Sequence, residues 1–181
     1  MQLFLIRHPR TEVPGGICYG RSDVGLAQPV ATDASRLATL LPTGCEIVSS
    51  PLQRARLLAE ALGPTRIEPR LAEMDFGEWE LRPFDTLRDE LDAWAADPLG
   101  FRPPGGESAA EMADRAQAAA AELMRRATPL AIVGHGGPLR AIAGDLLGLP
   151  AARWLALDFD FAALTELRVE PWGTTLRGFN R

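Results

Sequence analysis

The two histidines of this chain, His8 and His135, stand in matching sequence contexts and are the first candidates for chemistry. Each comes two residues after a short apolar run, Leu3–Ile6 in one case and Leu130–Val133 in the other. Runs of this kind indicate buried strands, and in open parallel sheets ligands bind just beyond the carboxyl ends of the strands. We therefore expect the two imidazoles to face one crevice.

The residues beside these histidines suit an anion. Arg7 precedes His8, and His135 is followed by the segment Gly136–Pro138, whose proline suits the first turn of a helix. A helix N-terminus offers unpaired N–H groups and the positive end of the helix dipole, and glycines let a phosphate approach closely. The sequence thus predicts a phosphate-binding helix start next to His135.

Charge and composition limit the kind of partner. The net charge of −5 argues against a nucleic-acid partner, because binding to a phosphate backbone requires a basic face. All 19 basic residues are arginine, so Schiff-base chemistry and the phosphate-binding lysine of Walker loops are excluded. Arginine must carry any recognition of phosphate, and a small-molecule phosphomonoester is the expected partner.

The two cysteines, Cys18 and Cys45, lack the spacing of a zinc site or of a disulfide framework. No cluster of His, Cys or carboxylate residues calls for a metal, so we expect neither a metal nor a cofactor. No charged leader, cleavage site or long apolar stretch is visible, and neither a membrane span nor membrane association is expected. These features favour a cytoplasmic enzyme, whose oligomeric state the sequence leaves open.

Strand-like runs alternate with helical patterns along the chain. Strands are predicted at 2–7, 46–50 and 130–134 and near 163–169 and 174–178, and helices at about 32–41, 52–62, 84–96, 108–126 and 138–147. Alternation of this kind is typical of a mainly parallel sheet with helices on both faces. We therefore expect an α/β fold, a three-layer αβα sandwich with a mainly parallel central sheet, formed by residues 1–181 as a single domain.

One helix start and two loops stand out within this pattern. Ser108 and Glu111 form a capping box, in which each side chain accepts a hydrogen bond from the other residue's backbone. Segments 9–28 and 97–107 are rich in Gly and Pro and poor in regular patterns. Loops of that length inside a domain are usually functional.

Short sequence blocks, in a fixed order between residues 7 and 137, match a known family. The matching blocks are Arg7–Thr11, Gly20–Leu26, Ser50–Ala55, Leu71–Glu80, Pro104–Ser108 and Gly134–Gly137. Together they resemble the histidine phosphatase, or phosphoglycerate mutase-like, superfamily. Several blocks in family order are far more specific than any one of them.

The resemblance implies a role for five residues. His8 is the nucleophile that attacks the phosphoryl group, and water then hydrolyses the phosphohistidine. Arg7 and Arg54 clamp the phosphoryl oxygens, a task that suits the planar guanidinium, and His135 completes the cage. Glu73 protonates the leaving alkoxide and later activates water. For attack, His8 must be neutral, with one ring nitrogen held by a backbone carbonyl and its pKa lowered by the nearby arginines.

The acid is the least distinct of these assignments. Asp75, Glu78 and Glu80 compete with Glu73 in sequence, and only the family pattern selects Glu73. Three more residues are candidates for binding the substrate or its phosphate, namely Thr11, Arg21 and Gly136. Thr11 has the alternative role of holding the loop, and Asp23 is expected to pair with a loop arginine.

The aromatic residues are expected in two places, in the hydrophobic core and around the substrate. Phe76 and Trp79 are expected in the core, since aromatics near strand ends usually fill space. Cover for the rest of the substrate is expected from the two long loops and their surroundings, where the candidates are Tyr19, Phe84, Trp94, Phe101 and Pro103.

Two residues depart from the family pattern, Pro9 and Leu81, each at a position where glycine is usual. Proline removes one backbone N–H and fixes φ near −65°. It is also found in the branch that this chain resembles most, so we do not expect it to abolish activity. Leu81 raises the question whether its loop keeps the family's conformation.

Segment 16–23 together with Arg7–Pro9 is similar to the α-ribazole phosphatase branch of cobalamin synthesis. The resemblance implies hydrolysis of α-ribazole 5′-phosphate or of the phosphorylated corrinoid. Three alternatives remain open: a broad-specificity sugar or nucleotide phosphatase, a phosphoglycerate mutase, and a catalytically silent phosphoryl-binding module. The short chain argues against the mutase, and the intact charged residues argue against the silent module.

Overall fold

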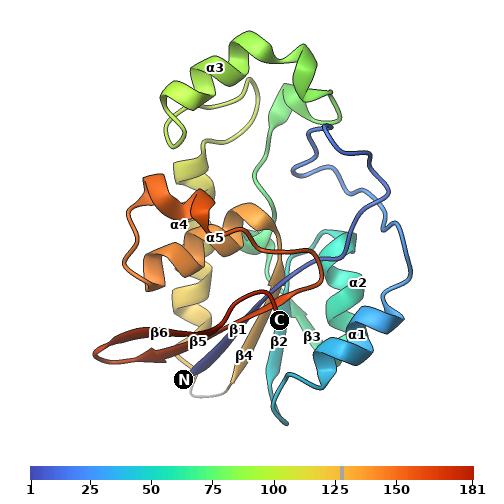
Figure 1. Cartoon of the computed structure of the whole chain (residues 1–181), viewed down its shortest axis with the longest axis vertical. Helices are drawn as coiled ribbons and strands as arrows, with labels where there is room; N and C mark the ends of the chain where they lie inside the picture. The colour runs from blue at the N-terminus through green and yellow to red at the C-terminus, as the bar shows by residue number, and fades with distance from the viewer. Residues whose placement is uncertain (127–128) are drawn as a thin grey trace.

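The computed structural model describes residues 1–126 and 129–181, which include one six-stranded sheet (Figure 1). Its strands are β1 (Gln2–Arg7), β2 (Glu46–Ser49), β3 (Thr65–Ile67), β4 (Leu130–Gly134), β5 (Leu164–Glu170) and β6 (Gly173–Gly178). The strand order is β3-β2-β4-β1-β5-β6. The first four strands run parallel, and β5 and β6 are antiparallel to their neighbours. The prediction of a mainly parallel sheet is confirmed.

Helices pack on both faces of this sheet. They are α1 (Ala31–Ala38), α2 (Gln53–Leu62), α3 (Arg88–Ala96), α4 (Ala109–Leu123) and α5 (Gly136–Leu146). Short 3₁₀ helices lie between them, namely η1 (Pro69–Leu71), η2 (Gly77–Trp79), η3 (Phe84–Thr86) and η4 (Ala151–Ala156). Helices α1 and α2 cover one face, α4 and α5 cover the other, and α3 stands away from the sheet (Figure 1). This is the expected three-layer arrangement.

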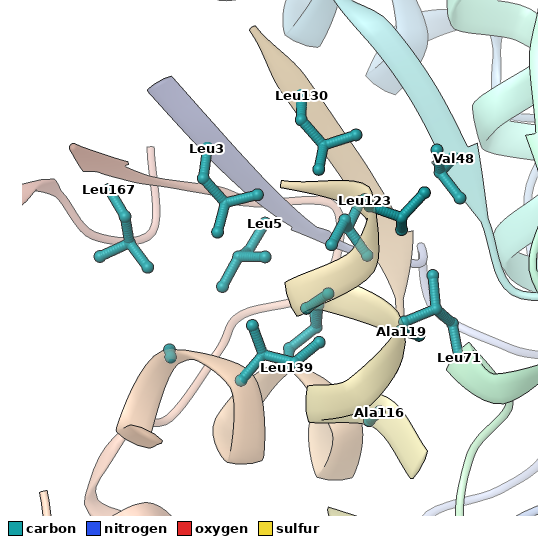
Figure 2. Packing of buried hydrophobic residues seen from close by; sticks show 14 of the residues in the cluster. Leu3, Leu5, Val48, Leu71, Ala116, Ala119, Leu123, Leu130, Leu139 and Leu167 are labelled. Atoms are coloured by element: carbon teal, nitrogen blue, oxygen red, sulfur yellow. The ribbon is translucent and has the colours of Figure 1, made fainter. Parts of the chain in front are cut away.

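The two faces of β1 explain why the sheet is buried on both sides. Leu3 and Leu5 point to the cluster that includes Leu123 of α4 and Leu139 of α5 (Figure 2). The alternate β1 residues Phe4 and Ile6 belong to the cluster formed with α1 and α2. Burying each such side chain contributes roughly 1.5–3 kcal/mol, so a register shift in β1 is strongly disfavoured.

The structure corrects several predicted boundaries. The helix expected at 84–96 is divided into η3 and α3, and the helix expected from Pro138 begins at Gly136. The earlier start makes His135 the N-cap residue of α5. Strand β3 and the 3₁₀ helices η1, η2 and η4 were not predicted, since elements of three to six residues are too short to show a period.

The capping box at the start of α4 is confirmed. Ser108 Oγ accepts a hydrogen bond from Glu111 N at 3.2 Å, and Glu111 Oε2 accepts one from Ser108 N at 2.9 Å. This pair fixes where the loop 97–107 ends and the helix begins. Among the described helices, none is long and apolar enough to cross a membrane.

Candidate active site

Three polar side chains follow directly on three adjacent parallel strands. His8 comes after β1, Ser50 after β2 and His135 after β4, and β4 lies between the other two strands. His8 N donates to Gly134 O at 3.0 Å, and Ser50 N donates to Val133 O at 3.0 Å, so the backbone pairing continues to the site. The ring centroids of the histidines are 5.1 Å apart. The two imidazoles therefore lie together beyond the carboxyl ends of β1 and β4, as the strand pattern predicts.

His8 is held with one nitrogen bonded and the other available. Its Nδ1 lies 2.7 Å from Pro9 O, and because a carbonyl can only accept, the proton is on Nδ1. Burial, followed by the nearby Arg54 guanidinium, lowers the pKa of His8 from 6.5 to about 3. His8 is consequently neutral at physiological pH, with the lone pair on Nε2.

His135 is fully buried and uses only one of its ring nitrogens. Its Nε2 lies 2.6 Å from Ser50 Oγ, whereas Nδ1 has no hydrogen-bond partner among the described residues. Burial, and after it the charge of Arg54, lowers the pKa of His135 well below its ordinary value. An unpaired buried nitrogen of this kind is costly unless a ligand satisfies it.

Two arginines flank the histidines, the buried Arg54 and the half-buried Arg7. Arg54, in the first turn of α2, is fully buried and donates to Gly20 O at 2.6 Å and Ser22 O at 2.8 Å. Arg7 donates to Phe159 O and lies 3.8 Å from the centroid of the Phe161 ring. In the part of the chain that the structure describes, neither Nε has a partner. Burial lowers the pKa of both guanidiniums. We call Arg7, His8, Ser50, Arg54 and His135 the strand-end cluster.

The loop that binds Arg54 is itself fixed by Glu80. The Glu80 carboxylate accepts hydrogen bonds from the backbone amides of Gly20, Arg21 and Ser22 at 2.8–3.1 Å. The same three-residue turn supplies both carbonyl oxygens to Arg54. Glu80 therefore supports the site from outside, because its carboxylate oxygens already accept these backbone hydrogen bonds.

Asp23 does not have the partner that the sequence analysis expected. Its Oδ1 accepts from Gln53 N at 2.7 Å, and Gln53 is the first residue of α2. The expected pairing with a loop arginine is wrong. A carboxylate at a helix N-terminus satisfies an unpaired N–H and interacts favourably with the helix dipole. Asp23 thus fixes the helix turn that carries Arg54.

Glu73 lies beside the start of α5, in residues 72–76, which we call the acid segment and which contain no helix or strand. Its Oε1 accepts from Met74 N at 2.9 Å and its Oε2 accepts from Gly137 N at 3.2 Å. A Cβ added to Gly137 would come within 2.4 Å of Glu73 Oε1. The second glycine after His135 therefore makes room for the carboxylate, and its amide is given to Glu73.

Arg115 and Glu107 together hold the acid segment in place, a role that was not predicted. Arg115 of α4 donates to Ala72 O at 2.7 Å and to Glu73 O at 3.0 Å. It also binds both oxygens of Glu107, which accepts from Asp75 N at 2.9 Å. Burial disfavours the charged form of Glu107, but hydrogen bonds from Arg115 and Asp75 lower its pKa overall. Only contacts between residues far apart in the sequence reveal this role, and no sequence motif indicates it.

The other predicted site residues differ in how close they lie to the histidines. Arg21 is partly exposed, 3.5 Å from Glu107 and 3.9 Å from Asp75. Thr11 is buried in a backbone bridge with Leu26, which fits its loop-holding alternative. Gly136 opens α5, with Arg140 Nη1 3.0 Å from the position of a Cβ. Within residues 1–126 and 129–181, no group of three or more His, Cys, Asp or Glu residues is arranged to hold a metal ion.

The remaining acids differ from Glu73 in their surroundings. Asp75 Oδ1 accepts from Gly77 N at 2.9 Å, and Glu78 is exposed. Neither contacts the start of α5 as Glu73 does.

The two residues that depart from the family pattern fit their positions differently. Pro9 supplies the carbonyl that binds His8 Nδ1, a role that needs no N–H of its own. Leu81 adopts a φ of 62°, in the left-handed region that favours glycine, and its N–H donates to Cys18 O at 2.7 Å. The loop thus has a backbone conformation that suits glycine, although leucine occupies it.

A cavity of about 380 Å³ adjoins Glu73. Of the five aromatic or proline residues expected to cover the substrate, only Trp94 lines it. Phe76, expected in the core, also lines the cavity, whereas Trp79 is buried as expected. The lining from η4, including Trp154 and Leu155, was not predicted, because it comes from a part of the chain without a sequence motif.

Comparisons with known proteins agree with this geometry. A glucosyl-3-phosphoglycerate phosphatase from Mycolicibacterium vanbaalenii is 34% identical over 86% of this chain and 78% of its own length. The "Probable phosphoglycerate mutase GpmB" of an Enterobacter species is 36% identical over 95% of this chain and 87% of its own. The solved structure of the α-ribazole phosphatase from Shigella flexneri superposes with a TM-score of 0.86 at 28% identity, covering 100% of this chain and 96% of that one.

The family assignment rests on nearly the whole chain. The model of the histidine phosphatase superfamily (branch 1) matches residues 3–181, a range that includes the strand-end cluster and the acid segment. The fold, the order of the sequence blocks and the comparisons agree. The chain therefore belongs to the histidine phosphatase superfamily and is a hydrolase of the phosphatase type.

Proposed function

We propose that the protein hydrolyses phosphomonoesters through a phosphohistidine on His8. The observation that carries the proposal is the unsatisfied hydrogen-bonding capacity around a neutral histidine. Arg7 Nε, Arg54 Nε and His135 Nδ1 are buried without partners in the described structure, and all three residues surround His8. A bound phosphoryl group offers the acceptor oxygens that the two guanidinium N–H groups lack.

In the first step, the lone pair on His8 Nε2 attacks phosphorus and forms a P–N bond. The bond between phosphorus and the ester oxygen breaks, and Glu73 in its protonated form gives its proton to the departing alkoxide. Arg7 and Arg54 stabilise the negative charge on the phosphoryl oxygens. Most of the catalysis in phosphoryl transfer comes from such positioning and electrostatics.

In the second step, water attacks the phosphohistidine. Glu73, now a carboxylate, accepts the proton of the water, and the P–N bond breaks with its electron pair returning to Nε2. Orthophosphate leaves, and His8 and Glu73 regain their initial protonation states. Glu73 contacts the start of α5, which His135 caps, and this position is compatible with both proton transfers.

As the preferred substrate we propose α-ribazole 5′-phosphate or the phosphorylated corrinoid made from it. The sequence segment 16–23 and the similarity to the Shigella flexneri enzyme support this choice. The role belongs to cobalamin synthesis in the cytoplasm. The unbridged thiols of Cys18 and Cys45 fit a reducing compartment.

The identity with the mutase-named relative favours a second candidate, transfer of phosphate between positions of phosphoglycerate. A mutase returns the phosphoryl group to substrate, whereas a phosphatase gives it to water. Incubation with 3-phosphoglycerate separates the two, because a mutase produces 2-phosphoglycerate and a phosphatase releases orthophosphate.

The main test compares phosphate release from α-ribazole 5′-phosphate, p-nitrophenyl phosphate and common sugar phosphates, using the wild-type protein and His8→Ala. We expect a strong preference for the ribazole ester and loss of all activity in the variant. Similar rates on all esters would leave the mechanism in place and contradict the substrate. Activity that persists in His8→Ala would contradict the nucleophile.

A further inference from the structure

The cavity beside Glu73 is lined mostly by carbon. It lies between α3, α4, η4 and the acid segment, and its volume of about 380 Å³ falls in the usual range for small-molecule sites. Its larger apolar side chains include Met74, Phe76, Trp94, Met112, Trp154 and Leu155. Glu73 and Gly137 line the same cavity, so it is continuous with the proposed site of proton transfer.

We propose that this cavity binds the part of the substrate beyond the ester oxygen and that it selects a flat, apolar ring system. The proposal rests on the proposed function of the strand-end cluster. If Glu73 protonates the leaving oxygen, the group attached to that oxygen must extend away from His8. The cavity, which Glu73 lines and His8 does not, is the space that such a group would enter.

The two tryptophans of the cavity have no hydrogen-bond donor left for a polar ligand. The indole Nε1 of Trp154 donates to Leu149 O at 3.2 Å, and that of Trp94 donates to Pro98 O at 3.3 Å. Indole has only this one donor. Each side chain therefore offers the cavity only aromatic carbon, which packs well against another flat ring.

Trp154 is fixed by a glycine of α5. A Cβ on Gly144 would lie 2.1 Å from Trp154 Cδ1, so the indole packs directly against the helix backbone. Together with the Nε1 hydrogen bond, this contact fixes the orientation of the ring before substrate arrives. A rigid aromatic wall lowers the entropy cost of binding.

The charged residues at the cavity, apart from Glu73, already have partners. Arg140 donates through Nε to Leu157 O and through Nη2 to Asp158 Oδ1, both at 2.9 Å. Asp97 Oδ1 accepts from Gly100 N at 2.9 Å. A second polar group, placed beyond the ribose and against this apolar wall, would lose hydrogen bonds to water without equivalent replacement, which favours an apolar ring at that position.

The test compares two esters that release the same kind of alkoxide, ribose 5-phosphate and the ribazole 5′-phosphate that carries benzimidazole. For the wild-type protein we expect kcat/KM to be roughly 10- to 100-fold higher for the ring-bearing ester. Trp154→Ala and, at the exposed rim, Leu155→Asp should reduce this ratio to a few-fold, because the ring-bearing ester loses more of its kcat/KM than ribose 5-phosphate does. A wild-type ratio near one, or a ratio unchanged in both variants, would contradict the cavity assignment.

Trp172→Ala is the matched control, because Trp172 is 76% exposed in the turn between β5 and β6 and does not line the cavity. It should leave the ratio unchanged. If neither ester is hydrolysed, the proposed function fails, but the cavity is still tested by binding of the phosphate-free benzimidazole riboside. Quenching of tryptophan fluorescence that is retained in Trp172→Ala and weakened in Trp154→Ala supports the site, and absence of binding to the wild-type protein overturns it.

Discussion

The strand-end cluster and the acid segment are held in place by different kinds of interaction. His8, Ser50 and His135 follow three strands whose backbone pairing fixes their relative positions. Glu73 lies in a segment without regular structure, and side chains from α4 and the loop before it fix that segment. The sheet can therefore position the nucleophile without side-chain help, whereas the acid depends on a network that single substitutions can break.

The two regions also differ in what they do to the reaction. The cluster acts on the phosphoryl group, which is the same in every substrate. The acid segment acts on the leaving oxygen, whose need for a proton depends on the ester. Substitutions in the cluster should therefore reduce activity on all esters alike, and substitutions in the acid segment should act selectively on esters with poor leaving groups.

The largest effect is expected for Arg54→Met. Loss of a buried guanidinium that stabilises the phosphoryl oxygens should lower kcat/KM on the order of 10³-fold. The loss should be similar for an alkyl ester and for p-nitrophenyl phosphate. Steady-state kinetics on both esters measures it, with thermal unfolding to verify that the variant is folded.

Arg56→Met is the matched control for Arg54. Arg56 belongs to the same helix but is partly exposed and pairs with Glu60 at 2.9 Å. A surface ion pair of this kind contributes little to stability, so activity and melting temperature should change only slightly. Equal losses in the two variants would mean that Arg54 has no specific part in the reaction.

Glu73→Gln tests the acid and should separate the two esters. The amide cannot donate a proton to an alkoxide, so kcat/KM for an alkyl phosphate should fall about 10²- to 10³-fold. For p-nitrophenyl phosphate, whose leaving group needs no proton, the loss should stay below about 10-fold. The comparison uses kcat/KM because this quantity reports only the steps up to formation of the phosphohistidine. Equal losses on the two esters would contradict the role of Glu73 as the acid.

The histidines of the cluster give a pH dependence with a definite sign. Burial and Arg54 lower the pKa of His8 to about 3, so below about pH 6.5 the unfolded chain binds a proton that the folded chain does not. The free energy of unfolding should therefore fall as the pH decreases from 6.5 toward 3, and this contribution is absent above 6.5. The slope from His8 is about 1.4 kcal/mol per pH unit, or about 2 kcal/mol between pH 6.5 and pH 5.

Urea unfolding of wild type and His8→Gln at pH 7.5 and pH 5 isolates this contribution, because the carboxylates are common to both proteins. Nitrogen NMR titration checks the cause directly, since the chain has only two histidines. The His8 ring should stay neutral down to about pH 4, and the His135 ring should show no titration near pH 6.5. A His8 signal that titrates near pH 6.5 would contradict the neutral nucleophile.

Arg115→Met should affect the two esters as unequally as Glu73→Gln does, but with a smaller loss of kcat/KM. Without Arg115, the carbonyls of Ala72 and Glu73 lose their donor and Glu107 loses its charge partner. We expect about a 10-fold lower kcat/KM on an alkyl ester, from a misplaced acid, and little change on p-nitrophenyl phosphate. In the double variant with Glu73→Gln the two losses should not add, because both act through the same carboxyl group.

Arg102→Met controls for loss of an arginine near the same helix. Arg102 is 55% exposed and pairs with Glu111 at the surface. It should leave the ratio between the two esters unchanged. If Arg115→Met lowers kcat/KM equally for both esters, Arg115 stabilises the fold without positioning Glu73 in particular.

This contrast also explains what the sequence could predict. The apolar runs before His8 and His135 gave both strand positions, and parallel strands bring their carboxyl ends together. The prediction of a shared crevice needed no information about side-chain packing. The order of β1, β4 and β2 in the sheet, which determines that Ser50 contacts His135, was not predictable from these runs.

The acid segment had no comparable signal. Three further acidic residues follow Glu73 within seven positions, and no period separates them from it. An arginine in an alanine-rich helix has the pattern of an exposed side chain, although Arg115 is largely buried. The cavity is lined by α3 and α4 together with η4, which comes later in the chain, and only folding brings η4 next to the two helices.

The smallest expected effect concerns backbone strain in the irregular region after the acid segment. Leu81 has a φ of 62° and is 56% exposed, so its side chain contributes little packing to offset an unfavourable conformation. For residues other than glycine, the left-handed region costs about 1–2 kcal/mol, and the greater flexibility of glycine in the unfolded chain offsets part of this. Leu81→Gly should therefore raise the free energy of unfolding by roughly 0.5–1 kcal/mol.

Leu81→Ala separates strain from side-chain loss. Alanine removes the same exposed side chain beyond Cβ but keeps the Cβ that makes a positive φ unfavourable. Urea unfolding should show that Leu81→Gly is more stable than both the wild-type protein and Leu81→Ala, and that the latter two are nearly equal in stability. The hydrogen bond from residue 81 N to Cys18 O is available to all three residues, so it does not affect the comparison. If alanine stabilises as much as glycine, the gain comes from removing an exposed leucine, and the loop carries no measurable strain at this position.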